Sequence, residues 1–160
     1  MGRLYTAVFK AIAVTAAQDF FEITAPSDSV VVVHEWGMFQ TTELGDAAEE
    51  QLQITTNRGT NLTTSGSGGA SVTPAPISVG DAAFGGTVER NNTTIMAVGT
   101  GSLTELEAMA WNIRVPFQRI YTPETRPIIS PGYRWTLEME STPADSITIS
   151  GYIIFEEVGG

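Results

Sequence analysis

The chain has 160 residues, no cysteine, and 18 acidic against 8 basic residues, which gives a net charge of −10. A chain of this length can bury about 70% of the surface that its unfolded form exposes, so it can fold as one domain without a disulfide or a metal. The absence of cysteine excludes disulfides and every zinc site that is built on cysteine ligands.

The first half of the chain is predicted to contain four strands. Residues 4–14 are rich in β-branched and aromatic side chains and lack a clear helix N-cap, so we expect a strand there, although the apolar spacing also fits a helix. Further strands are expected at 19–24, 29–41 and 50–58, with a connection at 43–48 between the last two.

Residues 29–41 form the strongest single strand. Strict alternation assigns Val30, Val32, His34, Trp36 and Met38 to one face, and Val31, Val33, Glu35, Gly37 and Phe39 to the other. Both faces are largely apolar, which predicts a central strand or one that is packed on both sides. Gly37 is the candidate for a β-bulge.

Residues 59–87 differ in composition from the rest of the chain. They are rich in Gly, Ser, Thr and Pro, and Pro74 and Pro76 exclude a central strand because proline cannot donate to the hydrogen-bond ladder. A connection of this length is unusual in a compact domain and is typically functional or mobile. The run SGSGG at 65–69 lacks the helix start of a phosphate-binding loop, so we expect a flexible loop.

The second half is predicted to contain four more strands. They cover 87–98, with a break at 91–92 as an alternative, then 106–121, 133–140 and 147–155. Pro116 indicates an edge or a bulge in the second of these, and one helical turn at 105–109 is a further alternative. Residues 133–140 and 147–155 alternate cleanly and flank a turn-rich connection, which predicts an antiparallel hairpin.

These elements define a fold class. About eight strands, irregularly spaced turns and no convincing long helix predict an all-β chain. We expect a single antiparallel β-sandwich or jelly-roll domain over residues 1–160, with a long connection at 59–87.

The sequence shows no constellation that indicates catalysis. The single histidine, His34, lies in the middle of a predicted strand, which favours a packed core or interface residue over a general base. Its neighbour Glu35 is expected on the opposite face, so the two cannot act together. We therefore expect no catalytic, cofactor-binding or metal-binding residues and no enzyme.

Several carboxylate pairs are the remaining candidates for acid–base chemistry. They are Glu49-Glu50, Glu105/Glu107, Glu138/Glu140 and Glu156-Glu157. The spacing of Glu105/Glu107 and of Glu138/Glu140 would place both acids on one face, about 7 Å apart, which a glycosidase could use. Glu138 and Glu140 are nevertheless expected on the solvated face of an amphipathic strand. The three Trp residues lie on apolar strand faces, which favours core packing over sugar stacking.

Charge and hydropathy limit the classes of partner that the chain is expected to bind. The basic residues are scattered and form no stripe, so we expect no nucleic-acid partner. The apolar residues 11–17 are far fewer than the about 20 that cross a bilayer, so we expect no membrane partner. No apolar run leads into a cleavage site, so no signal peptide is predicted.

A series of turn and strand motifs extends over nearly the whole chain. They are PSD at 26–28, GDAAEE at 45–50, GSGG at 66–69, TP at 73–74, GDAAFGGT at 80–87, TPE at 122–124, ISPG at 129–132 and SITISGYIIFEE at 146–157. Their order resembles a family of small virion proteins encoded by tailed bacteriophages, especially marine ones. The resemblance implies a jelly-roll capsid decoration (cement) protein made in the host cytoplasm and located on the capsid surface. It implies the major capsid protein and neighbouring virion proteins as partners, and a homo-oligomer, commonly a trimer.

Two other functions compete with this one. A tail-fibre or receptor-binding β-sandwich would recognise host glycans, and it requires aromatic side chains exposed on a concave face. A hydrolase on a β scaffold would depend on carboxylates such as Glu105 or Glu138.

Overall fold

The computed structural model describes residues 2–41 and 49–159, so the predicted connection at 43–48 lies outside the described residues. Within these ranges the chain forms strands and no helix, which confirms the all-β prediction. The strands are β1 (Arg3–Val14), β2 (Gln18–Thr24), β3 (Ser29–Gln40), β4 (Gln51–Gly59), β5 (Ala70–Val72), β6 (Ala75–Pro76), β7 (Thr87–Asn92), β8 (Leu103–Asn112), β9 (Phe117–Ile120), β10 (Ile128–Ile129), β11 (Arg134–Met139) and β12 (Ile147–Gly159).

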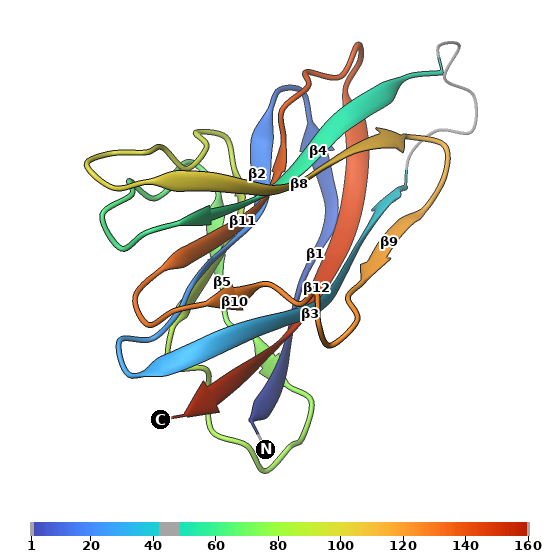
Figure 1. The fold of residues 1–160 in the computed structure, drawn as a ribbon. Helices are drawn as coiled ribbons and strands as arrows, with labels where there is room; N and C mark the ends of the chain where they lie inside the picture. The colour runs from blue at the N-terminus through green and yellow to red at the C-terminus, as the bar shows by residue number, and fades with distance from the viewer. Residues whose placement is uncertain (1, 42–48, 160) are drawn as a thin grey trace.

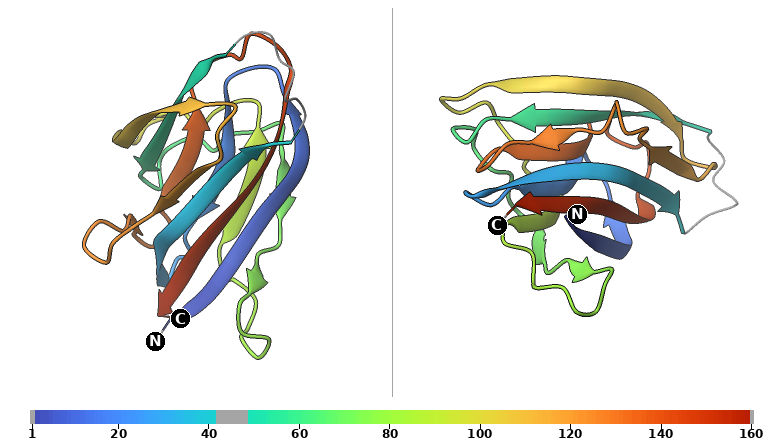
Figure 2. Two further views of the ribbon diagram at one scale, coloured as in Figure 1. Left: turned by 90° about the vertical axis from the view of Figure 1, so that its right-hand side faces the viewer. Right: turned by 60° about the horizontal axis from the view of Figure 1, so that its bottom comes forward.

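The strands pair antiparallel in two sheets that pack face to face (Figure 1). Sheet A has the order β10-β3-β12-β1-β6, with β9 also paired to β3, and sheet B has the order β5-β7-β2-β11-β4-β8. The two termini lie side by side at one end of the sandwich (Figure 2). The short strand β6, which contains Pro76, lies at a sheet edge. Proline has no N–H to donate to the hydrogen-bond ladder, and it is tolerated at an edge because no strand lies on the outer side.

The order of pairing is compatible with a jelly roll. Of the eight strands β1, β2, β3, β4, β8, β9, β11 and β12, the first pairs with the last, the second with the seventh, the third with the sixth and the fourth with the fifth. The chain thus passes repeatedly from one sheet to the other, so each sheet is assembled from strands that are distant in sequence.

The core lies between the sheets and contains all three Trp residues. Trp36, Trp111 and Trp135 are at most 1% exposed, which confirms the prediction that they pack in the core. The ring of Trp36 stacks on Phe117 with a centroid distance of 5.3 Å, and Phe9 stacks on Phe20 at 5.8 Å. Burying an aromatic side chain of this size typically stabilises a domain by about 3 kcal/mol or more.

Two predictions about the second half were wrong. The segments 133–140 and 147–155 are strands, but β11 belongs to sheet B and β12 to sheet A, so they do not form a hairpin. Period-two alternation identifies a strand but not its partner. The predicted strand 106–121 is divided into β8 and β9 by residues 113–116.

A β-bulge in β3 overturns the predicted faces of this strand. The register with β12 shifts so that Val33 pairs with Phe155 and Glu35 with Ile154, which leaves His34 as the extra residue. Trp36 and Met38 therefore face the core together with Val31 and Val33, and not with Val30 and Val32. The bulge is at His34 and not at the predicted Gly37.

The long connection 59–87 is not a free loop. Its middle part forms β5 and β6, each at a sheet edge. The SGSGG run, predicted to be flexible, is bonded along its length: Ser67 pairs with Thr94 in a β-bridge, and the N–H of Gly66 donates to the Glu22 carboxylate. The run therefore belongs to the ordered structure of the domain.

Candidate functional site

The outer face of sheet A, which points away from the core, carries many apolar side chains among polar ones. Strand register aligns its residues in rows: Ile128, Val32, Glu156 and Leu4 form one row across β10, β3, β12 and β1. Several apolar residues are well exposed, with 53% for Val8, 60% for Ile120 and 59% for Ile128. We call this surface the sheet A face. Its apolar residues are Leu4, Val8, Val30, Val32, Phe39, Ile120, Ile128, Tyr152, Ile154 and Val158.

His34 lies on the sheet A face and not in the core. Its Nε2 lies 3.1 Å from Glu156 Oε2, and both side chains are about one-fifth exposed. Because of the bulge, Glu35 is on this face too, which corrects the prediction that it lies opposite His34; it interacts with Tyr152, an outer residue of β12. The histidine therefore forms part of a small polar centre within an apolar surface.

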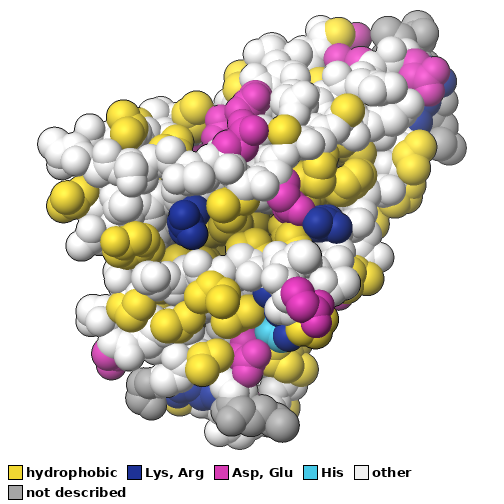
Figure 3. Space-filling view, viewed as in Figure 1, with side chains coloured by type: hydrophobic (Ala, Val, Ile, Leu, Met, Phe, Trp, Pro, Cys, Tyr) yellow, Lys and Arg dark blue, Asp and Glu magenta, His cyan; other side chains and the backbone are white. Residues whose placement is uncertain are grey.

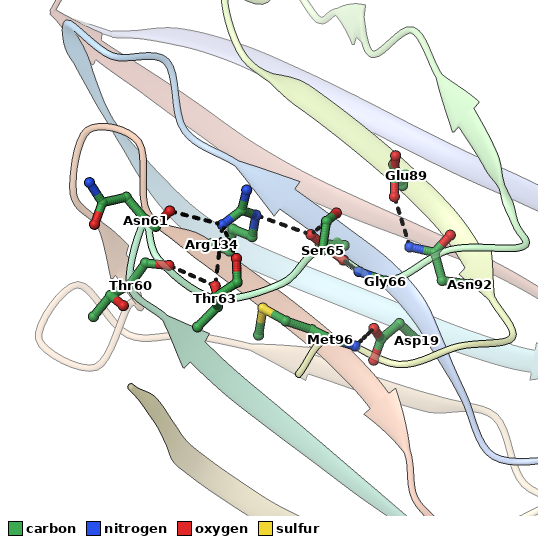
Figure 4. Close-up of polar contacts among 11 residues, drawn as sticks. Asp19, Thr60, Asn61, Thr63, Ser65, Gly66, Glu89, Asn92, Met96 and Arg134 are labelled. Carbon is green, nitrogen blue, oxygen red and sulfur yellow. Dashed lines mark hydrogen bonds and ion pairs between the residues drawn. The ribbon is translucent and has the colours of Figure 1, made fainter. Parts of the chain in front are cut away.

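The outer face of sheet B is covered by two loop segments, 60–69 and 93–102. Figure 4 shows how the first of these runs across β2 and β11. Glu22 on β2 accepts hydrogen bonds from the Ser65 hydroxyl at 2.6 Å and from the Gly66 N–H at 2.8 Å. Arg134 on β11 donates to the Thr63 carbonyl at 2.9 Å, and its Nε lies 3.4 Å from Glu22 Oε1. These contacts satisfy a buried carboxylate and fix the loop.

Two further acids on this outer face are buried. Asp19 is fully buried and accepts a 2.7 Å hydrogen bond from the Met96 N–H (Figure 4). Burial, assisted by the charges of Glu138 and Glu22, raises the pKa of Asp19 to about 8. Glu138 is 6% exposed, and burial together with the neighbouring Glu140 raises its pKa to about 7. The prediction that Glu138 lies on a solvated face was therefore wrong.

The bulge in the β4–β8 ladder separates Glu105 from Glu107. Glu107 pairs with Thr56 and Glu105 with Asn57, two successive residues of β4, so the two acids face opposite sides of sheet B. The expected shared face is therefore absent. Glu107 instead accepts hydrogen bonds from Arg119 and from the Tyr121 hydroxyl.

In each of the other carboxylate pairs, the two acids contact different groups. Glu156 lies on the sheet A face, whereas Glu157 is 2% exposed and is bound by the Tyr5 and Ser29 hydroxyls. Glu49 accepts from the Asn112 side chain, and Glu50 accepts from the Ala144 N–H. None of these arrangements directs two acids into one cleft.

The described residues offer neither a metal cluster nor a membrane-spanning helix. No group of three or more His, Asp or Glu side chains in residues 2–41 and 49–159 could hold a metal ion. No helix in the same ranges is long and apolar enough to cross a membrane.

Comparisons with protein-family models, curated proteins and solved structures returned no match. The likeness to phage virion proteins therefore stays a prediction. The sheet A face was also not recognised as a site from the sequence, although one signal of it was present. Residues 29–41 are apolar on both faces, and the described structure buries only one of these faces in the core.

Proposed function

We propose that the chain is a non-enzymatic structural protein that assembles with other protein surfaces through the sheet A face. The observation that carries the proposal is the extent of this apolar surface. The centre of the face is formed by β1, β3 and β12, which have 12, 12 and 13 residues, and β9 and β10 extend it at one edge. Exposed apolar surface on a soluble domain commonly marks an interaction site.

The composition of β3 supports the same conclusion. A strand that is apolar on both faces is normally covered on both sides. Within the described residues, the core covers Val31 and Val33, whereas Val30 and Val32 on the sheet A face are only half-buried. A second layer supplied by another molecule would complete their burial at about 25 cal/mol per Å² of apolar surface.

The particular role we propose is capsid decoration in a tailed phage. It rests on the resemblance of the motif order, and a rigid sandwich with one apolar outer face suits it. Decoration proteins bind in many symmetric copies, so modest single contacts add up by avidity. We propose a homo-oligomer, a trimer, that binds the major capsid protein and stabilises the shell.

The competing glycan-binding role is disfavoured by the Trp side chains. Stacking on sugars requires exposed aromatic faces, and all three Trp residues are at most 1% exposed.

Assembly through the sheet A face is tested by analytical ultracentrifugation of the wild type and of Val8→Glu and Ile120→Glu. Both positions are more than half exposed, so the variants should fold. A charge buried at a protein contact costs about 2 kcal/mol or more, so oligomers should dissociate at least about 30-fold more readily. Val98→Glu, equally exposed on a different surface, is the control. A monomeric wild type, or loss of assembly in the control alone, would refute the sheet A face as the contact between copies of this chain.

The phage role is tested separately by quantitative mass spectrometry of purified virions of the encoding phage. Hundreds of copies per particle would support decoration, and particles without the protein should then lose heat resistance. A few to a few dozen copies would place it in the tail, and absence from the particle would refute both virion roles.

A further inference from the structure

A groove of about 490 Å³ runs along the open side of the sandwich, between β8 of sheet B and β9 and β10 of sheet A. It is open to solvent, and Figure 3 shows this face with yellow side chains in a hollow and dark blue side chains on both sides of it. Arg58, Arg119 and Arg126 line the groove. The groove thus gathers three of the 8 basic residues of a chain whose net charge is −10.

One acid within the groove is already neutralised. Glu107 accepts hydrogen bonds from Arg119 Nε at 2.9 Å and from the Tyr121 hydroxyl, and Arg119 lies over the Tyr121 ring at 4.9 Å. The Tyr121 hydroxyl in turn accepts from the buried Trp36 Nε1 at 3.2 Å. Arg119 and Tyr121 are therefore held in place, and Glu107 offers little repulsion to an incoming anion.

The other two arginines of the groove can still form ion pairs with a ligand. Among the described residues, Arg58 and Arg126 take part in no ion pair within 4.0 Å. The Nε of Arg126 is buried and has no hydrogen-bond partner. A carboxylate in the groove can accept from the terminal N–H groups of Arg126, which form no ion pair among the described residues. The remaining acid of the lining, Glu124, is exposed.

Apolar side chains lie beside these cations. Leu106 is 38% exposed and Ile128 is 59% exposed, and both line the groove. We infer that the groove binds an acidic peptide segment of a partner protein. A carboxylate of the segment accepts from Arg58 and Arg126, and a neighbouring apolar side chain packs on Leu106 and Ile128. The groove is open to solvent, so an extended segment can enter it. Ile128 belongs to both surfaces, whereas Arg58, Leu106 and Arg126 line the groove and are not part of the sheet A face.

The test uses two acetylated, amidated hexapeptides with the centres Leu-Glu-Leu-Glu and Leu-Gln-Leu-Gln. Binding is followed by nuclear magnetic resonance at the arginine Nε–H signals and the Ile128 methyl signals. The acidic peptide should shift the Arg58, Arg126 and Ile128 signals saturably, and the Gln peptide should not. Arg126→Gln and Arg58→Gln should each weaken binding at least about tenfold, because each removes one side of a charged hydrogen bond. Arg114→Gln, an exposed arginine outside the groove, should leave it unchanged.

Three results would overturn the inference. Equal binding of the two peptides would show that the groove does not recognise the negative charge of the peptide. Binding of inorganic phosphate with no binding of the acidic peptide would leave a site for small anions only. Groove variants that change self-association in the ultracentrifuge, with no effect on peptide binding, would make the groove a contact between copies of this chain.

Discussion

The buried Asp19 should make the stability of the protein fall as the pH rises. Its pKa is about 8 in the folded protein, mainly because of burial, and about 3.9 in an unfolded chain. Between these values the folded protein holds a proton that the unfolded chain has released. The free energy of unfolding therefore decreases as the pH rises from about 4 to about 8, and levels off above that range.

The magnitude is large relative to a typical domain stability. One pKa unit corresponds to about 1.4 kcal/mol, so Asp19 alone accounts for a loss of about 4 kcal/mol between pH 5 and pH 8. Small domains have total stabilities of about 5–15 kcal/mol. Glu138, whose pKa is raised to about 7, adds a decline in the same direction.

Asp19→Asn isolates this effect, because the amide keeps the shape and its oxygen can still accept from the Met96 N–H. Urea unfolding is followed by tryptophan fluorescence at pH 5, 6, 7, 8 and 9, since all three Trp residues are buried. The free energy of unfolding of the variant minus that of the wild type should increase by about 4 kcal/mol between pH 5 and pH 8, because only the wild type loses the contribution of Asp19. The exposed Asp145→Asn is the matched control and should follow the wild type. An identical pH profile for Asp19→Asn and the wild type would refute the reasoning.

Two further predictions concern packing and hydrogen bonding. Gly69→Ala should destabilise the domain by about 1–3 kcal/mol in urea unfolding, because a Cβ there would collide with the Arg90 carbonyl oxygen, whereas Gly80→Ala meets no atom within 4 Å and should be neutral. Tyr121→Phe should lower the free energy of unfolding by about 1–3 kcal/mol, because it leaves the buried Trp36 Nε1–H without its acceptor.

Each of these has an outcome that would contradict it. Equal stabilities of the two alanine variants would mean that the segment 60–69 can move away from β7 at no cost. For Tyr121→Phe the comparison is Tyr152→Phe, whose half-buried hydroxyl accepts from Gln118 near solvent. A loss no larger than that of Tyr152→Phe would show that the Trp36 donor finds another partner.

The positions of the strands were largely predictable because a strand's period of two is a local property. Alternation located β3, β4, β11 and β12 within a few residues, composition and turn residues located β1 and β2, and the prolines excluded a central strand from the region that contains β6. Burial of the three Trp residues followed from the same local argument, since each lies on an apolar strand face.

Pairing and bulges were decided by the tertiary structure. The partners of β12 are β1 and β3, more than a hundred residues away in the sequence, so no local pattern could specify them. A single extra residue at His34 reverses every face assignment beyond it, and another at Leu106 separates Glu105 from Glu107.

Both proposed binding surfaces also depend on the tertiary structure. The sequence by itself determined an acidic, cysteine-free chain of β-strands and contained one hint of a surface, the doubly apolar segment 29–41. Only the folded sandwich brings Arg58 of β4 close to Arg126, which precedes β10, around one groove. The physical reason is that strands pair and sheets stack through surfaces that fit each other, whatever the order of the strands along the sequence. A site built from several strands is therefore a property of the assembled fold.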